Sequence, residues 1–207
     1  MNFISYKVDN SKKLKKMKKE KPSYFKRGGK ASVFLYNEQS NGLVHVILKL
    51  NDEYLIRTRL FNEYTSIPFD HYINVFFNIR NSNVFIEESL SVYLQVAIEF
   101  LEERNGVSID QKILTNEIFI NLTNKFLNNS SVTRLEYIDK IDDIDKELEF
   151  VSEKEFKRLI QNDITIEFMT WRFSDFYASA NINGKIKLDN SNDEFLVKWL
   201  GVFSDVI

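Results

Sequence analysis

Basic side chains are concentrated at the start of the chain, where their spacing suits the binding of phosphates. Eleven of the first thirty residues are basic and two are acidic, which gives this arm a formal charge of +9 on a chain of −2. The basic residues are Lys7, Lys12, Lys13, Lys15, Lys16, Lys18, Lys19, Lys21, Lys26, Arg27 and Lys30. Cations at this density bind a phosphate backbone without sequence preference. All of them except Lys7 are candidate nucleic-acid-binding residues.

Three other interpretations of the arm remain open. Leu14 and Met17 between the lysines are a weak amphipathic anchor for an anionic membrane surface. An acidic protein is a second alternative partner. The third alternative is a solvated tail, because Lys, Asn, Ile and Phe are abundant throughout the chain. That composition is typical of a low-GC bacterium, a phage or a mobile element.

The region after the arm has the aromatic and β-branched residues of an antiparallel sheet. A short loop, Asn51-Asp52-Glu53, predicts a hairpin in which Leu50 lies opposite Tyr54. Extending the same alternation places Val33 opposite Val46, and one face of the sheet becomes almost wholly apolar. The four predicted strands are Ser32–Tyr36, Leu43–Leu50, Tyr54–Phe61 and His71–Arg80.

The opposite face of this predicted sheet combines aromatic rings with cations. Bases can stack on rings while Lys and Arg hold phosphates, so such a face suits single-stranded nucleic acid. The alternative is a polar face whose cations pair with local acids. Its candidate binding residues are Phe34, Tyr36, His45, Lys49, Arg57 and Arg59. Tyr72, Asn74, Phe76, Asn78 and Arg80 join them if the fourth strand is part of the sheet.

Two helices are expected to cover the apolar face. Residues Glu87–Arg104 have apolar residues at helical spacing and end at Asn105-Gly106, and a second helix runs to about residue 127. The predicted fold class is α+β: a four-stranded antiparallel meander covered by two helices, followed by a smaller α+β portion. We therefore divide the chain into a basic arm (1–30), a sheet-plus-two-helix domain (31–130) and a C-terminal portion (131–207).

The C-terminal portion begins with an acid-rich stretch, residues 136–155, that resembles a linker and has a charge of −6. It is a hypothetical internal dock for the basic arm. Ser152-Glu-Lys-Glu155 predicts the start of a short helix, and Asn183-Gly184 predicts a hairpin turn. The remaining predicted elements are the strands Ile164–Phe173, Phe176–Ile182 and Lys185–Leu188 and the helix Asp193–Phe203.

Known catalytic motifs do not occur in the chain. There is no cysteine and only two histidines, which argues against thiolate or histidine-rich metal sites. Asp142-Asp143-Ile144-Asp145 lacks the glycine of a calcium loop. We expect no cofactor and no metal, and a non-enzyme is favoured over an enzyme.

The sequence thus predicts a non-enzymatic, cytoplasmic protein that contacts DNA or RNA through the arm and the sheet face. The first alternative is a protein–protein interaction module, such as a subunit of a phage-defence or mobile-element complex, or a homo-oligomer. The second is a cryptic metal-dependent nuclease. No stretch is apolar and long enough for a transmembrane segment.

Overall fold

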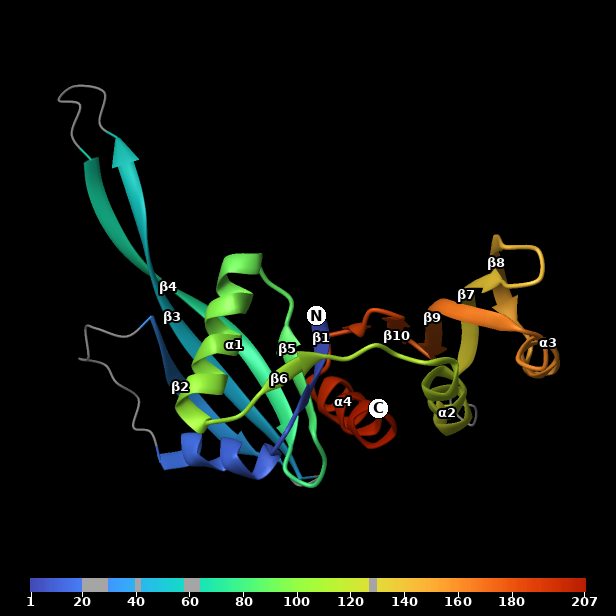
Figure 1. Ribbon diagram of the computed structural model, residues 1–207, viewed down its shortest axis with the longest axis horizontal. Coiled ribbons are helices and arrows are strands. Elements are labelled where there is room, and N and C mark those ends of the chain that lie inside the picture. The colour runs from blue at the N-terminus through green and yellow to red at the C-terminus, as the bar shows by residue number, and fades with distance from the viewer. Residues whose placement is uncertain (20–29, 40–41, 58–63, 127–129) are drawn as a thin grey trace. The chain divides into compact units, whose positions relative to one another are not determined.

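The computed structural model describes residues 1–19, 30–39, 42–57, 64–126 and 130–207, and only the backbone of residues 56, 57, 64 and 65 (Figure 1). The fold is mixed α+β, as predicted, but it contains more strands than one four-stranded meander. It consists of two compact units. The meander unit is Val8–Ile109, and the C-terminal unit combines Met1–Lys7 with Asp110–Ile207. These units divide the chain at other positions than the three segments expected from the sequence.

The meander unit contains four antiparallel strands in chain order, β2-β3-β4-β5. Its elements are the 3-10 helix η1 (Ser11–Lys19), β2 (Ala31–Glu38), β3 (Leu43–Arg57), β4 (Tyr64–Asn78), β5 (Asn83–Glu87) and the helix α1 (Ser91–Asn105). Figure 1 shows α1 lying across this sheet, with η1 near one end of the helix.

One face of the sheet is apolar, as the sequence predicted, and α1 covers it. Val46 pairs with Val75 and Leu48 with Ile73, and all four side chains are buried. The alternation of apolar residues along β3 places them on one side of the strand because successive side chains point to opposite faces. This face is called the helix side below, and the opposite face is called the outer side.

The predicted hairpin at Asn51-Asp52-Glu53 is wrong, because β3 continues through these residues. The strand β3 pairs along its whole length with β4, with Leu43 opposite Asn78 and Arg57 opposite Tyr64. The polar residues take part in the strand because tertiary contacts use them. Tyr93 Oη on α1 donates a hydrogen bond of 2.6 Å to Asp52 Oδ2, and the Glu53 N–H donates to Asp52 Oδ1.

The predicted register between the first two strands is wrong by two residues at Val33 and by three residues from Leu35 onward. Val33 pairs with Leu48 rather than Val46, and a bulge follows between Val33 and Leu35. A bulge inserts one extra residue and so reverses the faces of the residues after it. Tyr36 consequently pairs with Val46 on the helix side instead of lying beside His45.

The C-terminal unit is not the smaller α+β portion that the sequence predicted, since its strands, ordered β1-β11-β10-β9-β7-β8, outnumber those of the meander unit. Only one of the two helices expected over the meander belongs to the meander unit, since α2 lies in this one. Its elements are β1 (Asn2–Val8), β6 (Ile109–Gln111), α2 (Asn116–Phe126), β7 (Ser131–Asp139), β8 (Ile144–Val151), α3 (Glu153–Leu159), β9 (Ile164–Phe173), β10 (Phe176–Asn181), β11 (Lys185–Leu188) and α4 (Asp193–Val206).

Local signals in this unit are confirmed where they depend on turn and cap chemistry. Gly184 has a φ of 74° in the β10–β11 turn, and Ser152 Oγ accepts a hydrogen bond from the Glu155 N–H at the start of α3. The linker expected at 136–155 is wrong, because β7 and β8 form an antiparallel hairpin there.

The core of the C-terminal unit is aromatic. Trp171 on β9 is buried between α2 and α4, and its Nε1–H donates to Thr123 Oγ1 at 3.1 Å. The ring of Phe126 contacts both Trp171 and Trp199 edge to face. Phe173 on β9 belongs to the same core, since its ring contacts those of Phe126 and Trp199.

No helix in the described ranges has both the length and the apolar character of a membrane span.

Candidate functional site

The first part of the candidate site is η1, which organises the lysines of the arm. Residues recur on one side of a 3-10 helix every three positions, because the helix has three residues per turn. Ser11, Leu14 and Met17 form one such row, and the side chains of Leu14 and Met17 are 0% exposed. This part of the arm is thus neither a solvated tail nor a membrane anchor, since its two apolar residues are buried in the fold.

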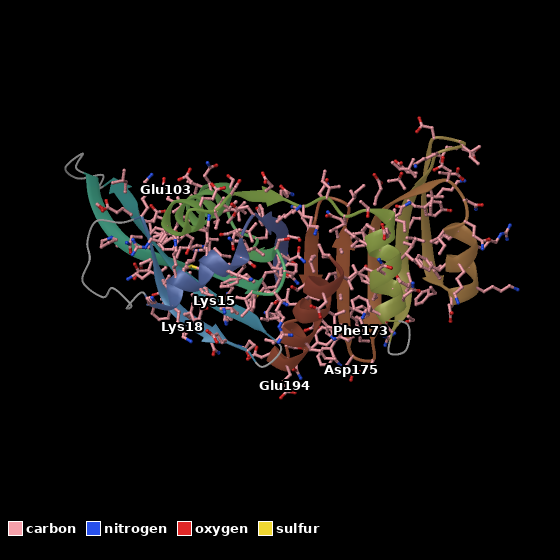
Figure 2. All side chains as sticks on the ribbon, turned by 60° about the horizontal axis from the view of Figure 1, so that its bottom comes forward. Lys15, Lys18, Glu103, Phe173, Asp175 and Glu194 are labelled. Atoms are coloured by element: carbon pink, nitrogen blue, oxygen red, sulfur yellow. The ribbon has the colours of Figure 1, made fainter. Side chains whose placement is uncertain are left out.

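The other two rows of η1 consist of lysines. The first row is Lys12, Lys15 and Lys18, and the second is Lys13, Lys16 and Lys19. Figure 2 labels Lys15 and Lys18 on this helix. Burying one row of three leaves the two lysine rows side by side on the remaining surface.

Three of the six lysines have partners within the meander unit. Lys13 Nζ donates to the Gly106 carbonyl at 2.6 Å, and Lys16 Nζ lies 3.5 Å from the Asn105 carbonyl. Both contacts place a cation at the C-terminal end of α1, where the helix dipole favours positive charge. Lys18 Nζ lies 3.0 Å from Glu38 Oε1.

The other three, Lys12, Lys15 and Lys19, are exposed and have no partner among the described residues. We call these three side chains the lysine ridge. Of the remaining basic candidates of the arm, Lys30 is exposed just before β2. Lys21, Lys26 and Arg27 lie outside the described residues.

The second part of the candidate site is the outer side of the sheet. Phe34 at the β2 bulge and Tyr72 on β4 are 39% and 42% exposed, and their rings meet edge to face at 5.0 Å. Lys49 is opposite Tyr72 on the neighbouring strand. These three residues are a small aromatic surface with one cation beside it.

The cations of the outer side have acidic or polar partners. Lys49 Nζ lies 2.8 Å from Asp70 Oδ2, and this hydrogen bond raises the pKa of the lysine. His45 is stacked on Phe76 at 4.3 Å, and its Nε2 lies 2.7 Å from Asn74 Oδ1. The outer side is therefore less basic than the sequence suggests. Arg59 and the side chain of Arg57 lie outside the described residues.

The structure separates the predicted binding residues into two groups. Glu38, which holds Lys18, pairs with Val44 on the helix side, and η1 packs against α1 on that same side. Phe34 and Lys49, by contrast, lie on the outer side. The lysine ridge and the aromatic surface therefore do not form one continuous face.

Sequence reasoning missed a polar cluster where β3 and β4 extend beyond the other strands. The hydrogen bond that Tyr93 donates to Asp52 is the main cause of two pKa shifts. It lowers the pKa of Asp52 and raises the pKa of Tyr93 to about 12. The His71 ring stacks on Tyr93 at 4.4 Å, and His71 Nε2 lies 2.9 Å from Ser89 Oγ. Together these contacts fix the start of α1 on the sheet.

Two features of the described residues bear on an enzyme centre. In the described part of the chain no group of three or more His, Asp or Glu side chains could hold a metal ion. His71 and Ser89 have the distance of a base and a hydroxyl nucleophile, but the cluster around them is explained by its structural contacts.

Comparison with known protein families finds no matching family, and comparison with curated proteins finds no match either.

Proposed function

We propose that this protein binds nucleic acid through the lysine ridge of η1, without sequence preference. The main observation in support of this proposal is that apolar and basic residues of η1 lie on different sides of the helix. Leu14 and Met17 anchor the helix, while Lys12, Lys15 and Lys19 remain exposed without a partner in the described residues. Fixed cations lose less conformational entropy on binding than cations on a disordered tail, because the backbone is already ordered.

The spacing of Lys12 and Lys15 within the ridge also suits a phosphate backbone. A 3-10 helix rises about 2 Å per residue, so Lys12 and Lys15, which are one turn apart, are about 6 Å apart along the axis. That interval is close to the advance of roughly two nucleotides along one strand of B-DNA. The rest of the chain is acidic, which favours approach of an anion at the ridge rather than elsewhere.

The test is a binding titration of labelled single-stranded DNA, single-stranded RNA and duplex DNA over a series of salt concentrations. The variant K12Q/K15Q/K19Q removes the ridge, and K125Q/K154Q/K187Q removes the same charge from exposed lysines of the C-terminal unit. Each phosphate contact changes log K by about 0.7–0.9 for a tenfold change in salt concentration. Between about 1 M and 0.1 M salt, three contacts therefore strengthen binding roughly a hundredfold, and the ridge variant should lose this gain.

The salt dependence gives an independent measurement of the same contacts. The slope of log K against log salt should fall by about 2–3 in the ridge variant and stay unchanged in the control. The proposal fails if the wild-type protein does not bind at about 50 mM salt, where phosphate contacts are strongest. It also fails if the ridge variant and the control bind equally.

The aromatic surface on the outer side is a separate element of the proposal. If bases stack on Phe34 and Tyr72, the variant F34A/Y72A should bind single strands with a binding free energy that is weaker by about 1–3 kcal/mol for each stacked base. Its affinity for duplex DNA should change little. Equal affinity of F34A/Y72A and wild type for single strands would restrict the interface to the ridge.

A further inference from the structure

The strand β8 is an edge of the sheet in the C-terminal unit. It pairs with β7 on one side, and among the described residues no strand pairs with its other side. An unpaired edge presents a row of backbone N–H and C=O groups that can pair with another chain. Figure 1 shows β8 beyond β7 and β9 in this unit.

The side chains on one face of β8 are acidic. Asp145, Glu147 and Glu149 alternate along the strand and are exposed. Arg134 on β7 forms an ion pair with Glu147, in which Arg134 Nε lies 2.9 Å from Glu147 Oε1. Asp145 and Glu149 have no partner in the described part of the chain. Charges on an edge often prevent aggregation, so they do not by themselves indicate a partner.

Phe150 is the second feature of this edge. An exposed aromatic ring does not prevent aggregation as edge charges do, so it needs another explanation. Its side chain is 75% exposed, and its backbone φ is 52°. The left-handed region costs an ordinary residue about 1–2 kcal/mol, and β-pairing skips Phe150 and Thr133. A strained backbone thus holds an aromatic ring in solvent beside the free edge. Ile144, at the other end of the strand, is also exposed.

A second copy of this chain is a poor occupant of the edge. Antiparallel pairing of two β8 strands about Glu147 would place Asp145 opposite Glu149 of the other copy, twice. Like charges directly opposite each other destabilise a pair of strands. The complementary occupant is a strand with cations at alternating positions, which would meet the same residues as opposite charges.

We propose that β8 binds an extended segment of a partner protein with Lys or Arg at every second position. The segment adds to the sheet as a further strand, its cations meet Asp145 and Glu149, and an apolar side chain packs on Phe150. This proposal is independent of nucleic-acid binding by η1, because it uses other residues in the other unit.

The probe is a synthetic peptide of alternating lysine and valine, titrated against the full chain. One control peptide has the same composition with its lysines in one block, and another alternates glutamate and valine. The protein variant is D145K/E149K, and its matched control is E103K/D175K, whose two acids are exposed elsewhere (Figure 2).

The alternating basic peptide should bind wild type and E103K/D175K equally, and D145K/E149K about tenfold more weakly, because two cross-strand attractions become repulsions. The glutamate peptide should show the reverse preference. Hydrogen exchange of the β8 amides should slow when the basic peptide binds, since strand pairing protects them. Equal binding by the block peptide, unchanged β8 exchange, or equal affinity for D145K/E149K and wild type would each overturn the proposal.

Discussion

The basic helix η1 and the acidic strand β8 are two charged segments that differ in the location of their apolar residues. In η1 the apolar residues Leu14 and Met17 are buried and half of the lysines have no partner in the described residues. In the β7–β8 hairpin Arg134 and Lys146 neutralise several acids, while the apolar side chains of Ile144 and Phe150 are exposed. Both segments expose charge, but only β8 also exposes apolar side chains.

This difference shows that a run of charge in a sequence does not indicate disorder. Both segments resembled unstructured sequence, and both have regular structure. The two segments differ in the location of their few apolar residues. Where those residues are buried, as in η1, the charged side chains of the other rows are left facing solvent. The lysine ridge therefore suits a ligand of dense charge, while β8 suits a partner that also covers apolar surface.

The largest expected effect tests whether the apolar residues of η1 are anchors. L14A and M17A should each lower the free energy of unfolding of the meander unit by about 2–5 kcal/mol, since both remove fully buried side chains. I144A and F150A in β8 should cost less than about 0.5 kcal/mol, as expected for exposed positions. Native-state hydrogen exchange of the β3 and β8 amides measures each unit separately. A loss below 1 kcal/mol for both η1 variants would mean that η1 is not anchored.

The next effect concerns the strain at Phe150. Asn tolerates the left-handed region better than Phe does, so F150N should stabilise the C-terminal unit by about 0.5–1 kcal/mol. I144N is the matched control, because Ile144 is exposed on the same strand and has an ordinary backbone. It should give no gain. The two variants are compared by the exchange of β7 and β8 amides, and a destabilised F150N would contradict the strain.

Part of the fold could be predicted from local patterns in the sequence. The apolar face of β3 and the turn at Gly184 follow from local alternation and turn chemistry, which is why they were predicted. The rows of η1 were also visible, since Ser11, Leu14 and Met17 are three residues apart, but a 3-10 helix of this length is uncommon. The alternating acids at 145, 147 and 149 were a strand signal hidden by the overall charge.

Other features depend on residues that are distant in the sequence. Asp52 interrupts an apolar pattern, and the hydrogen bond that it accepts comes from Tyr93, which lies 41 residues away on α1. A single inserted residue at the β2 bulge moved Tyr36 to the helix side. The partners of Lys13 and Lys16 are carbonyls about ninety residues away. No local pattern separates these paired lysines from those of the lysine ridge.

A smaller effect is the pH dependence of the stability of the β7–β8 hairpin. Lys146 Nζ donates to Asp139 Oδ2 at 2.6 Å, and this hydrogen bond is the main cause of the lowered pKa of Asp139. Its stabilisation is present above the unfolded-state pKa of 3.8 and is lost as the pH falls through the folded-state pKa. D139N should therefore be less stable than wild type near neutral pH and equally stable in strong acid. Thermal unfolding of D139N and D145N over a pH series measures this, and the two variants would behave alike if the ion pair contributed nothing.

The smallest expected effect is the response of the two segments to salt, which should have opposite signs. Like charges one turn apart on a helix cost about 0.2–0.5 kcal/mol, so screening should stabilise η1, where Lys12 and Lys15 are neighbours in one row. The same screening should weaken the ion pairs of Arg134 and Lys146 in the hairpin. Hydrogen exchange at low and high salt should therefore slow at η1 and quicken at β8, each by about twofold. In K12Q/K15Q/K19Q the change at η1 should disappear while that at β8 remains. If both segments respond in the same direction, the lysine ridge does not carry the uncompensated charge assigned to it, and the contrast between the segments would reduce to their apolar residues alone.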